Sequence, residues 1–94
     1  MDAARIVMIV WEGIEIEVTY KPKDILAMSH LELRIPSKAR IPVTETGYRS
    51  EYLHPGTVED AGGPQAYVIA WLDHTAQSRE WQAHVVTSRQ LSLF

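Results

Sequence analysis

The chain has 94 residues, a formal net charge of −3 and no cysteine, which corresponds to one domain. The missing cysteine excludes disulfides, cysteine-ligated zinc and a thiol nucleophile, and it fits a cytoplasmic location. The acidic balance lacks the Lys/Arg surplus of non-specific nucleic-acid binders, so direct nucleic-acid binding is not expected. No apolar run approaches the roughly 20 residues that span a membrane, and no signal peptide is expected at the start.

The first half of the chain has the pattern of strands. Residues 6–11, IVMIVW, form a continuous apolar run that is typical of a strand buried on both faces. Glu12-Gly13 predicts a tight turn, because glycine tolerates positive φ. Apolar and polar residues then alternate over 14–20 and again over 31–35, which predicts two half-exposed strands.

Pairing of these two alternating strands puts Arg34 opposite Glu15 or Glu17 on the exposed face. Prolines bracket the next segment, and Val43-Thr44 just after it predicts a short edge strand. The polar stretch 46–50 that follows is predicted to be a loop.

The second half predicts helices. Thr57 is suited to cap a short helix that Gly62-Gly63 ends, and Pro64 suits the first position of a second helix. Ser78 suits the cap of a third helix, which is expected to fray near Arg89. Residues at helical spacing define the core face of the second helix: Val68, Trp71, Leu72 and Thr75.

This order of elements, strands first and helices second, predicts an α+β fold. We expect a small antiparallel sheet of three to four strands in the N-terminal half. Two to three C-terminal helices pack on one face of it, which gives two layers. Residues 1–89 then form a single domain, and residues 90–94 form a flexible tail.

The tail reads Gln-Leu-Ser-Leu-Phe, and three large apolar side chains on a free end call for an explanation. Three explanations are open. The side chains fold back and complete the core, they mediate self-association into a homodimer, or they form a linear motif that binds another protein. Average residue frequencies put a chance match to one particular five-residue sequence at one position on the order of one in a million.

Gln90, Leu91, Ser92, Leu93 and Phe94 resemble at every position the motif by which bacterial proteins bind the DNA polymerase sliding clamp. The resemblance implies that the Gln90 amide enters a small polar pocket and that Leu91 packs beside the groove. Leu93 and Phe94 enter the deep apolar pocket, and Ser92 faces outward. It implies a small non-enzymatic interaction protein that docks on the clamp and regulates replication or repair.

The body of the chain also resembles a group of short proteins of alphaproteobacteria and their plasmids. The resemblance lies in residues 42–50, in Ala61-Gly62-Gly63-Pro64, in Ala70-Trp71-Leu72 and in the tail. It implies a source and no activity.

A second candidate site is the predicted loop made of Thr46, Gly47, Tyr48, Arg49 and Ser50. Tyr48 and Arg49 have the chemistry to hold a phosphate or carboxylate, with Gly47 allowing close approach of the backbone. This makes a small-ligand or protein-binding module, with a packed or self-associating tail, the alternative function. In the structural interpretation of the same residues, Gly47 serves a turn, Tyr48 caps the core, and Arg49 forms an ion pair with Glu45 or Glu51.

Catalytic and metal-binding motifs are missing. The sequence has no P-loop, dinucleotide fingerprint or nucleophile elbow, so it leaves enzymatic activity undecided and leans against it. His74 and His84 meet across a helical hairpin in one arrangement, where a metal would need Asp73 or Glu80 as a further ligand. The sequence therefore predicts neither a metal nor another cofactor.

Overall fold

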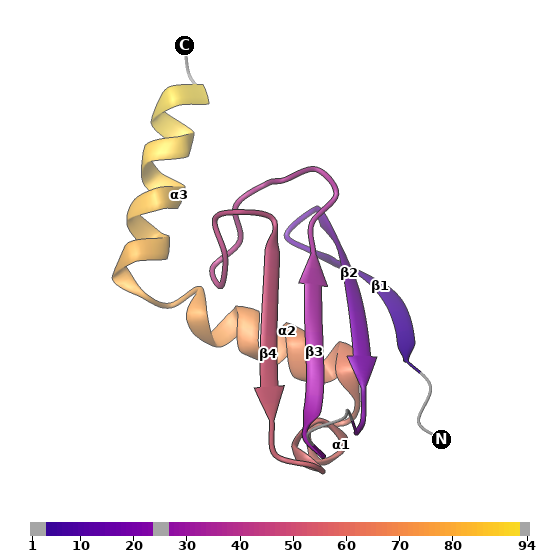
Figure 1. Cartoon of the computed structure of the whole chain (residues 1–94). Coiled ribbons are helices and arrows are strands. Elements are labelled where there is room, and N and C mark those ends of the chain that lie inside the picture. The colour runs from indigo at the N-terminus through magenta and orange to yellow at the C-terminus, as the bar shows by residue number, and fades with distance from the viewer. Residues whose placement is uncertain (1–3, 24–26, 93–94) are drawn as a thin grey trace.

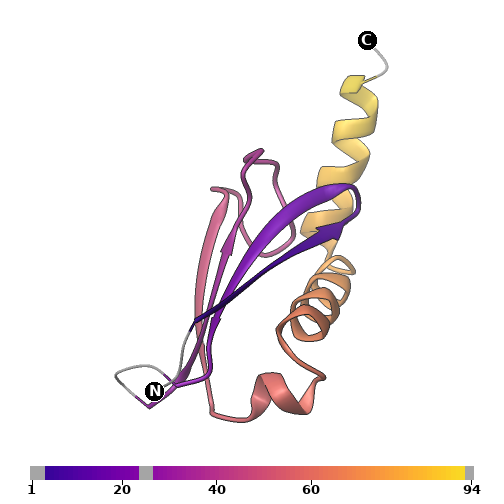
Figure 2. The same cartoon turned by 90° about the vertical axis from the view of Figure 1, so that its right-hand side faces the viewer.

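The computed structural model describes residues 4–23 and 27–92, with side chains up to residue 88. A four-stranded antiparallel sheet in the order β1-β2-β3-β4 precedes the helices of this part of the chain (Figure 1). The strands are β1 Arg5–Trp11, β2 Ile14–Lys21, β3 Ser29–Arg34 and β4 Tyr48–Leu53. The helices are α1 Thr57–Asp60, α2 Pro64–Thr75 and α3 Arg79–Ser92. The predicted α+β class is confirmed, and Figure 2 shows the sheet and the helices side by side as two layers.

β1 and β2 form a hairpin whose ladder runs without interruption from Arg5 opposite Tyr20 to Trp11 opposite Ile14. Glu12 and Gly13 make the turn with φ of 51° and 77°. Two positive φ angles in succession give the twist that matches the flanking strands. The predicted turn is therefore confirmed, with Gly13 supplying the conformation that other residues adopt only at a cost.

The prediction that β1 is buried on both faces is wrong. β1 is an edge strand, and its outward side chains are exposed: Ile6 by 64%, Met8 by 49% and Val10 by 64%. Ile9 and Trp11 alternate with them and are buried. In the part of the chain that the structure describes, the helices cover only one face of the sheet, so the apolar run 6–11 keeps half of its side chains in solvent.

β2 and β3 pair as the alternation predicts, and Glu17 is the residue opposite Arg34. The predicted short strand at Val43-Thr44 is wrong, because this segment holds only an isolated bridge between Ile41 and Thr44. The fourth strand starts later, at Tyr48. The intervening loop closes where the Ile35 N–H donates to the Gly47 carbonyl over 2.9 Å.

The helix starts follow the sequence in two of three cases. Pro64 begins α2, and the Ser78 hydroxyl accepts a hydrogen bond from the Trp81 N–H over 3.2 Å at the start of α3. Thr57 is not a cap: Gly56 holds that position with φ of 90° and no side-chain hydrogen bond. A left-handed cap favours glycine, which explains why Thr57 is shifted into the helix.

The core lies between the inner face of the sheet and helices α1 and α2. Val58, Val68 and Leu72 are its helical members, and all three are fully buried. Of the tryptophans, Trp11 is buried at 5% exposure, whereas Trp71 and Trp81 are half-buried and pack against the core. The strands supply the remaining buried apolar residues: Ile9, Trp11, Ile16, Val18, Tyr20, Leu31 and Leu33, with Ile35 and Ile41 from the following loop.

α3 leaves the body of the molecule after its first turns (Figures 1 and 2). The ring of Trp81 lies 5.8 Å from that of Trp11, and the molecule is elongated, measuring 52 × 23 × 20 Å. α3 continues to Ser92, beyond Arg89, near which fraying is expected. Residues 79–92 contain neither glycine nor proline, so nothing in them interrupts the helical hydrogen bonds.

Candidate functional site

The segment that resembles the clamp-binding motif begins on the last turn of α3. The backbone of residues 90–92 is helical, whereas Leu93 and Phe94 lie outside the described residues. The side chains of Gln90, Leu91 and Ser92 are likewise not described. Their predicted roles as anchors therefore stay predictions. The backbone places the start of the motif on the part of α3 that leaves the body (Figure 1).

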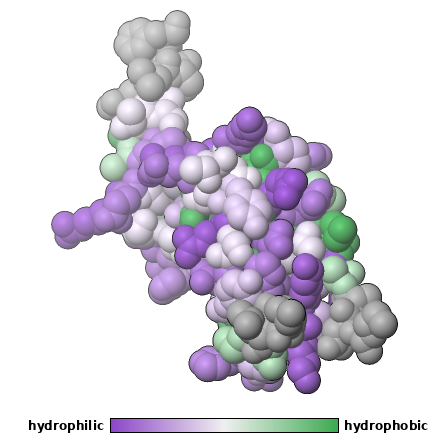
Figure 3. Space-filling view, in the orientation of Figure 1, coloured by the Kyte–Doolittle hydropathy of each residue, from purple (hydrophilic) through white to green (hydrophobic). Residues whose placement is uncertain are grey.

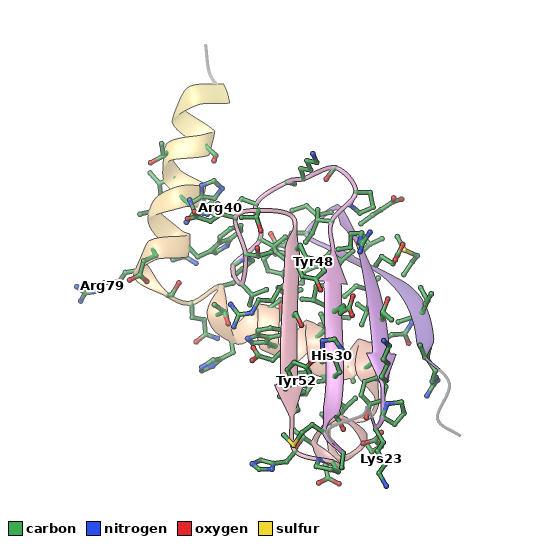
Figure 4. The ribbon with its side chains drawn as sticks, in the orientation of Figure 1. Lys23, His30, Arg40, Tyr48, Tyr52 and Arg79 are labelled. Carbon is green, nitrogen blue, oxygen red and sulfur yellow. The ribbon has the colours of Figure 1, made fainter. Side chains whose placement is uncertain are left out.

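A groove lies beside the base of α3. It has a volume of about 340 Å³, with Trp11 and Ile14 of the β1–β2 hairpin on one side and Trp81 and Val85 on the other. This is at the lower end of the roughly 300–1,000 Å³ that is common for small-molecule pockets. Arg40 lies at its rim, on the α3 side of the molecule (Figure 4).

Apolar and polar residues share the lining of this groove, and the polar ones are Glu12, Arg40, His84 and Ser88. The Arg40 guanidinium is paired with the Glu45 carboxylate over 2.9 Å. The indole N–H of Trp11 donates to Asp73 Oδ1 over 2.9 Å. The first contact lies within the loop between β3 and β4, and the second joins β1 to α2. Beside the groove, the ring contact between Trp11 and Trp81 seats the first turn of α3 on the sheet.

The predicted ligand-binding loop at residues 46–50 is a loop only in part. Thr46 and Gly47 lie in the loop, but Tyr48, Arg49 and Ser50 form the first half of β4. Successive side chains of a strand point to opposite faces. Tyr48 therefore lies on the open face and Arg49 on the helical face, so the two cannot hold one ligand together.

Arg49 already has partners on the helical side of the sheet. Its guanidinium donates to Glu51 Oε2 over 2.9 Å and lies 5.6 Å from the ring centre of Trp71. This confirms the structural interpretation, in which Arg49 pairs with Glu51. The stack of Arg49 on Trp71 joins β4 to α2. The interpretation of residues 46–50 as a loop did not include this contact.

The open face of the sheet carries a cluster that the sequence did not predict. His30 of β3 is only 8% exposed and stacks on the Tyr52 ring at a centroid distance of 4.4 Å (Figure 4). Its Nε2 lies 2.6 Å from the Ser50 hydroxyl, and its Nδ1 lies 3.6 Å from Glu32 Oε1. His30 is nearly buried because Tyr52 and Ser50 of β4 cover it.

Ser50, His30 and Glu32 have the residue types of a nucleophile, base and acid. Catalysis also needs donors for the developing oxyanion and a site from which water is excluded. The 3.6 Å separation of His30 Nδ1 from Glu32 is longer than a hydrogen bond. Ser50 lies on an open, largely hydrophilic face (Figure 3). The cluster is therefore a cross-strand contact that orders β3 and β4.

One further polar contact joins the sheet to α1. The buried Tyr20 hydroxyl donates to the Glu59 carboxylate. Burial raises the pKa of the Tyr20 phenol, and its hydrogen bond to Glu59 raises it further. The same hydrogen bond lowers the pKa of the Glu59 carboxyl. The pair therefore favours a neutral phenol and an ionised carboxylate over the neutral pH range.

No candidate metal centre forms among residues 4–23 and 27–92, since no three acidic or histidine side chains there are placed to hold an ion. The hypothetical site at His74 and His84 is thus not assembled, and Asp73 is bonded to Trp11. In the same part of the chain, no helix has the length and apolar character needed to cross a bilayer.

The amino-acid sequence of this chain matches a known protein family. Residues 4–81 match the family described as KlcB third domain. The chain belongs to this family. No curated protein and no solved structure matches it.

The KlcB third domain match covers β1 through to the start of α3 and ends at Trp81. Trp81 is also the residue that packs on Trp11 before α3 leaves the body. The family match thus ends within the first turn of α3, at its contact with β1. The rest of α3 and the segment 90–94 lie beyond the matched residues.

Proposed function

We propose that this chain is a small plasmid-associated protein-interaction domain that binds the DNA polymerase sliding clamp through residues 90–94. The observation that carries the proposal is the sequence Gln-Leu-Ser-Leu-Phe, which agrees with the clamp-binding motif at all positions. The KlcB third domain match supports the coarser part, a domain that acts through other proteins. The bound clamp would place the domain at sites of replication or repair.

The position of the motif supports this proposal. α3 carries residues 90–92 beyond the packed part of the domain (Figures 1 and 2). A partner can therefore approach the motif without displacing the sheet or α2. The motif also lies outside the matched residues 4–81, as expected for a segment added to an existing fold.

Binding requires a change in the last turn of α3. The motif binds as an extended segment, whereas residues 90–92 are helical in the unbound chain. The end of a helix unwinds at little cost, because its last carbonyls have no helical partners. Burial of Leu93 and Phe94 supplies about 1.5–3 kcal/mol for each side chain. Ordering of the segment offsets part of this gain, so we expect a micromolar Kd.

Fluorescence polarisation with purified sliding clamp and the labelled full chain tests the proposal. Leu93→Ala/Phe94→Ala should weaken binding by about 30-fold or more, since about 1.4 kcal/mol corresponds to tenfold in Kd. Val86→Ala is the matched control, because Val86 is 53% exposed on the same helix and outside the motif. It should bind like the wild type. Comparable binding by the double variant and the wild type would refute clamp docking.

A further inference from the structure

The free edge of β1 has the features of a pairing surface. Among the strands that the structure describes, β1 is the first of the sheet and pairs with β2 alone. Within residues 4–23 and 27–92, no loop or helix backbone donates to it or accepts from it. Such an edge presents a row of N–H and C=O groups that another strand can satisfy.

β1 lacks the devices by which proteins block a free edge. Charged residues, proline and bulges are the usual ones. Residues 6–11 contain neither a charge nor a proline, and the ladder to β2 is continuous from Arg5 to Trp11. A second strand can therefore pair along the whole length of β1.

The outward side chains of β1 add an apolar strip to this edge. Ile6, Met8 and Val10 are 64%, 49% and 64% exposed and point to the same face of the sheet. Figure 3 shows that face as mostly hydrophilic, with hydrophobic atoms on the side where β1 lies. A partner strand with apolar residues at the same spacing would cover the strip.

We propose that the occupant of this edge is a second copy of the same chain, paired antiparallel through β1. The seven residues of β1 are symmetric about Met8. A two-fold axis at Met8 places Met8 opposite itself and Ile6 opposite Val10 of the other copy. The three exposed apolar residues of each copy then meet along one strip, and each copy uses the full length of β1.

Charge favours the same arrangement. Arg5 begins β1, and Glu12 follows directly after its end. Antiparallel pairing brings Arg5 of one copy to the end of the strand where Glu12 of the other copy lies, and this happens at both ends. In this register Arg5 lies opposite Trp11, one residue before Glu12 of the other copy, so the charges at each end of the paired strands attract each other. This complementarity is a property of β1 paired with itself.

Pairing about Met8 also places the open faces of the two sheets on the same side of the dimer. Residues directly opposite in an antiparallel ladder point to the same face. Met8 lies opposite Met8, so the open faces of the two sheets join and the helical layers remain on the other side. The result is a continuous sheet through both copies, with β1 no longer at an edge.

Sedimentation velocity over a series of micromolar concentrations tests the dimer. The wild type should reach the mass of a dimer. Met8→Lys should raise the dimer Kd by at least about tenfold, because two like charges would face each other in the new ladder. Val86→Lys adds the same charge on α3 and should leave the dimer unchanged. Leu93→Ala/Phe94→Ala should also dimerise, which separates this proposal from clamp binding. A monomeric wild type, or an unaffected Met8→Lys variant, would overturn the proposal.

Disulfide cross-linking tests the register with variants that keep β1 apolar. The chain has no cysteine of its own, so Met8→Cys introduces a single thiol. Directly opposite Cα atoms lie about 4.5–5.5 Å apart, within the roughly 4.4–6.8 Å that a disulfide spans. Mild oxidation should link Met8→Cys chains to each other, while Ile6→Cys should link only to Val10→Cys. Efficient linkage of Ile6→Cys to itself, or none for Met8→Cys, would overturn the pairing about Met8.

Discussion

The two edge strands of the sheet, β1 and β4, differ in the charged side chains that they carry. On β4, Arg49 and Glu51 pair with each other on the helical face, and Arg49 also stacks on Trp71. On β1, the corresponding edge has no charge between Arg5 and Glu12. Charged side chains that point inward discourage strand addition. β4 is therefore a closed edge, whereas β1 is an open one.

The open face shows the same contrast. The aromatic side chains of β4 have partners on β3: Tyr52 stacks on His30, and the Arg34 guanidinium lies 5.9 Å from the Tyr48 ring centre. Residues opposite the exposed positions of β1 are polar and leave them uncovered: Thr19, Glu17 and Glu15. Tyr48 and Tyr52 are themselves 44% and 49% exposed, so the contrast lies in their partners on β3 and not in exposure alone.

The largest expected effect on stability comes from a substitution on the buried face of β1. Trp11 is buried, contacts Trp81 and donates to Asp73. We expect Trp11→Ala to lower the free energy of unfolding by about 3–5 kcal/mol, the usual cost of such a cavity. Urea denaturation followed by circular dichroism measures this loss, at low concentration so that association does not contribute.

Val10→Ala is the control for that measurement. Val10 precedes Trp11 on β1 but points to the open face and is 64% exposed. Its truncation should change stability by less than about 0.5 kcal/mol in the monomer. Equal losses for the two variants would contradict the assignment of the core to one face of β1.

The sequence could predict that residues 6–11 form a strand, but not that one face is exposed. A continuous apolar run is typical of a doubly covered strand. Whether cover exists depends on elements that are distant in sequence. Here α1 and α2 pack on the inner face, and the described chain places no layer on the other side (Figure 2). In the strand at residues 14–20, polar residues alternate with apolar ones. The sequence alone could therefore predict which face of this strand is buried.

A smaller effect is expected at a central strand, where neither edge is involved. Tyr20→Phe removes the hydrogen bond to Glu59 and keeps the ring in the core. We expect a loss of about 0.5–1.5 kcal/mol at neutral pH, the usual net value of one hydrogen bond. Urea denaturation at several pH values measures it. Since neither edge changes, the oligomeric state of this variant should equal that of the wild type.

The pH dependence of this loss has a definite sign. The pKa of Glu59 is lowered from its usual 4.5 in the folded chain, so its contribution is present above pH 4.5 and is lost as the pH falls through the lowered pKa. The pKa of Tyr20 is raised from 10.0, so its contribution is present below pH 10 and disappears as the pH rises through the raised pKa. The difference between wild type and Tyr20→Phe should shrink at both extremes. A difference that stays constant down to acid pH would contradict the role of Glu59.

The position of β4 shows why part of the site could not be predicted. Residues 48–53, YRSEYL, place polar or aromatic groups on both faces, so the hydrophobic period of two that reveals a half-buried strand is missing. The short apolar segment Val43-Thr44 resembles a strand more closely. Since His30 gains Tyr52 and Ser50 as neighbours only through β4, its burial also escaped prediction. The motif at residues 90–94 needs no tertiary context, which is why sequence alone could propose it.

A comparably small effect on stability is expected from opening the closed edge. Arg49→Val/Glu51→Val removes an exposed ion pair, which contributes about 0–1 kcal/mol, and the contact of Arg49 with Trp71, which contributes about 0.5–1 kcal/mol at an exposed site. It gives β4 apolar residues in place of its two charges. The measurement uses the Met8→Lys background, in which β1 is blocked. Restored association in sedimentation velocity would then have to involve β4. We expect such association, because Arg49 and Glu51 are the charges that close this edge. If the triple variant stays monomeric, the closed character of β4 must come from its twist or from the loop before Tyr48 instead.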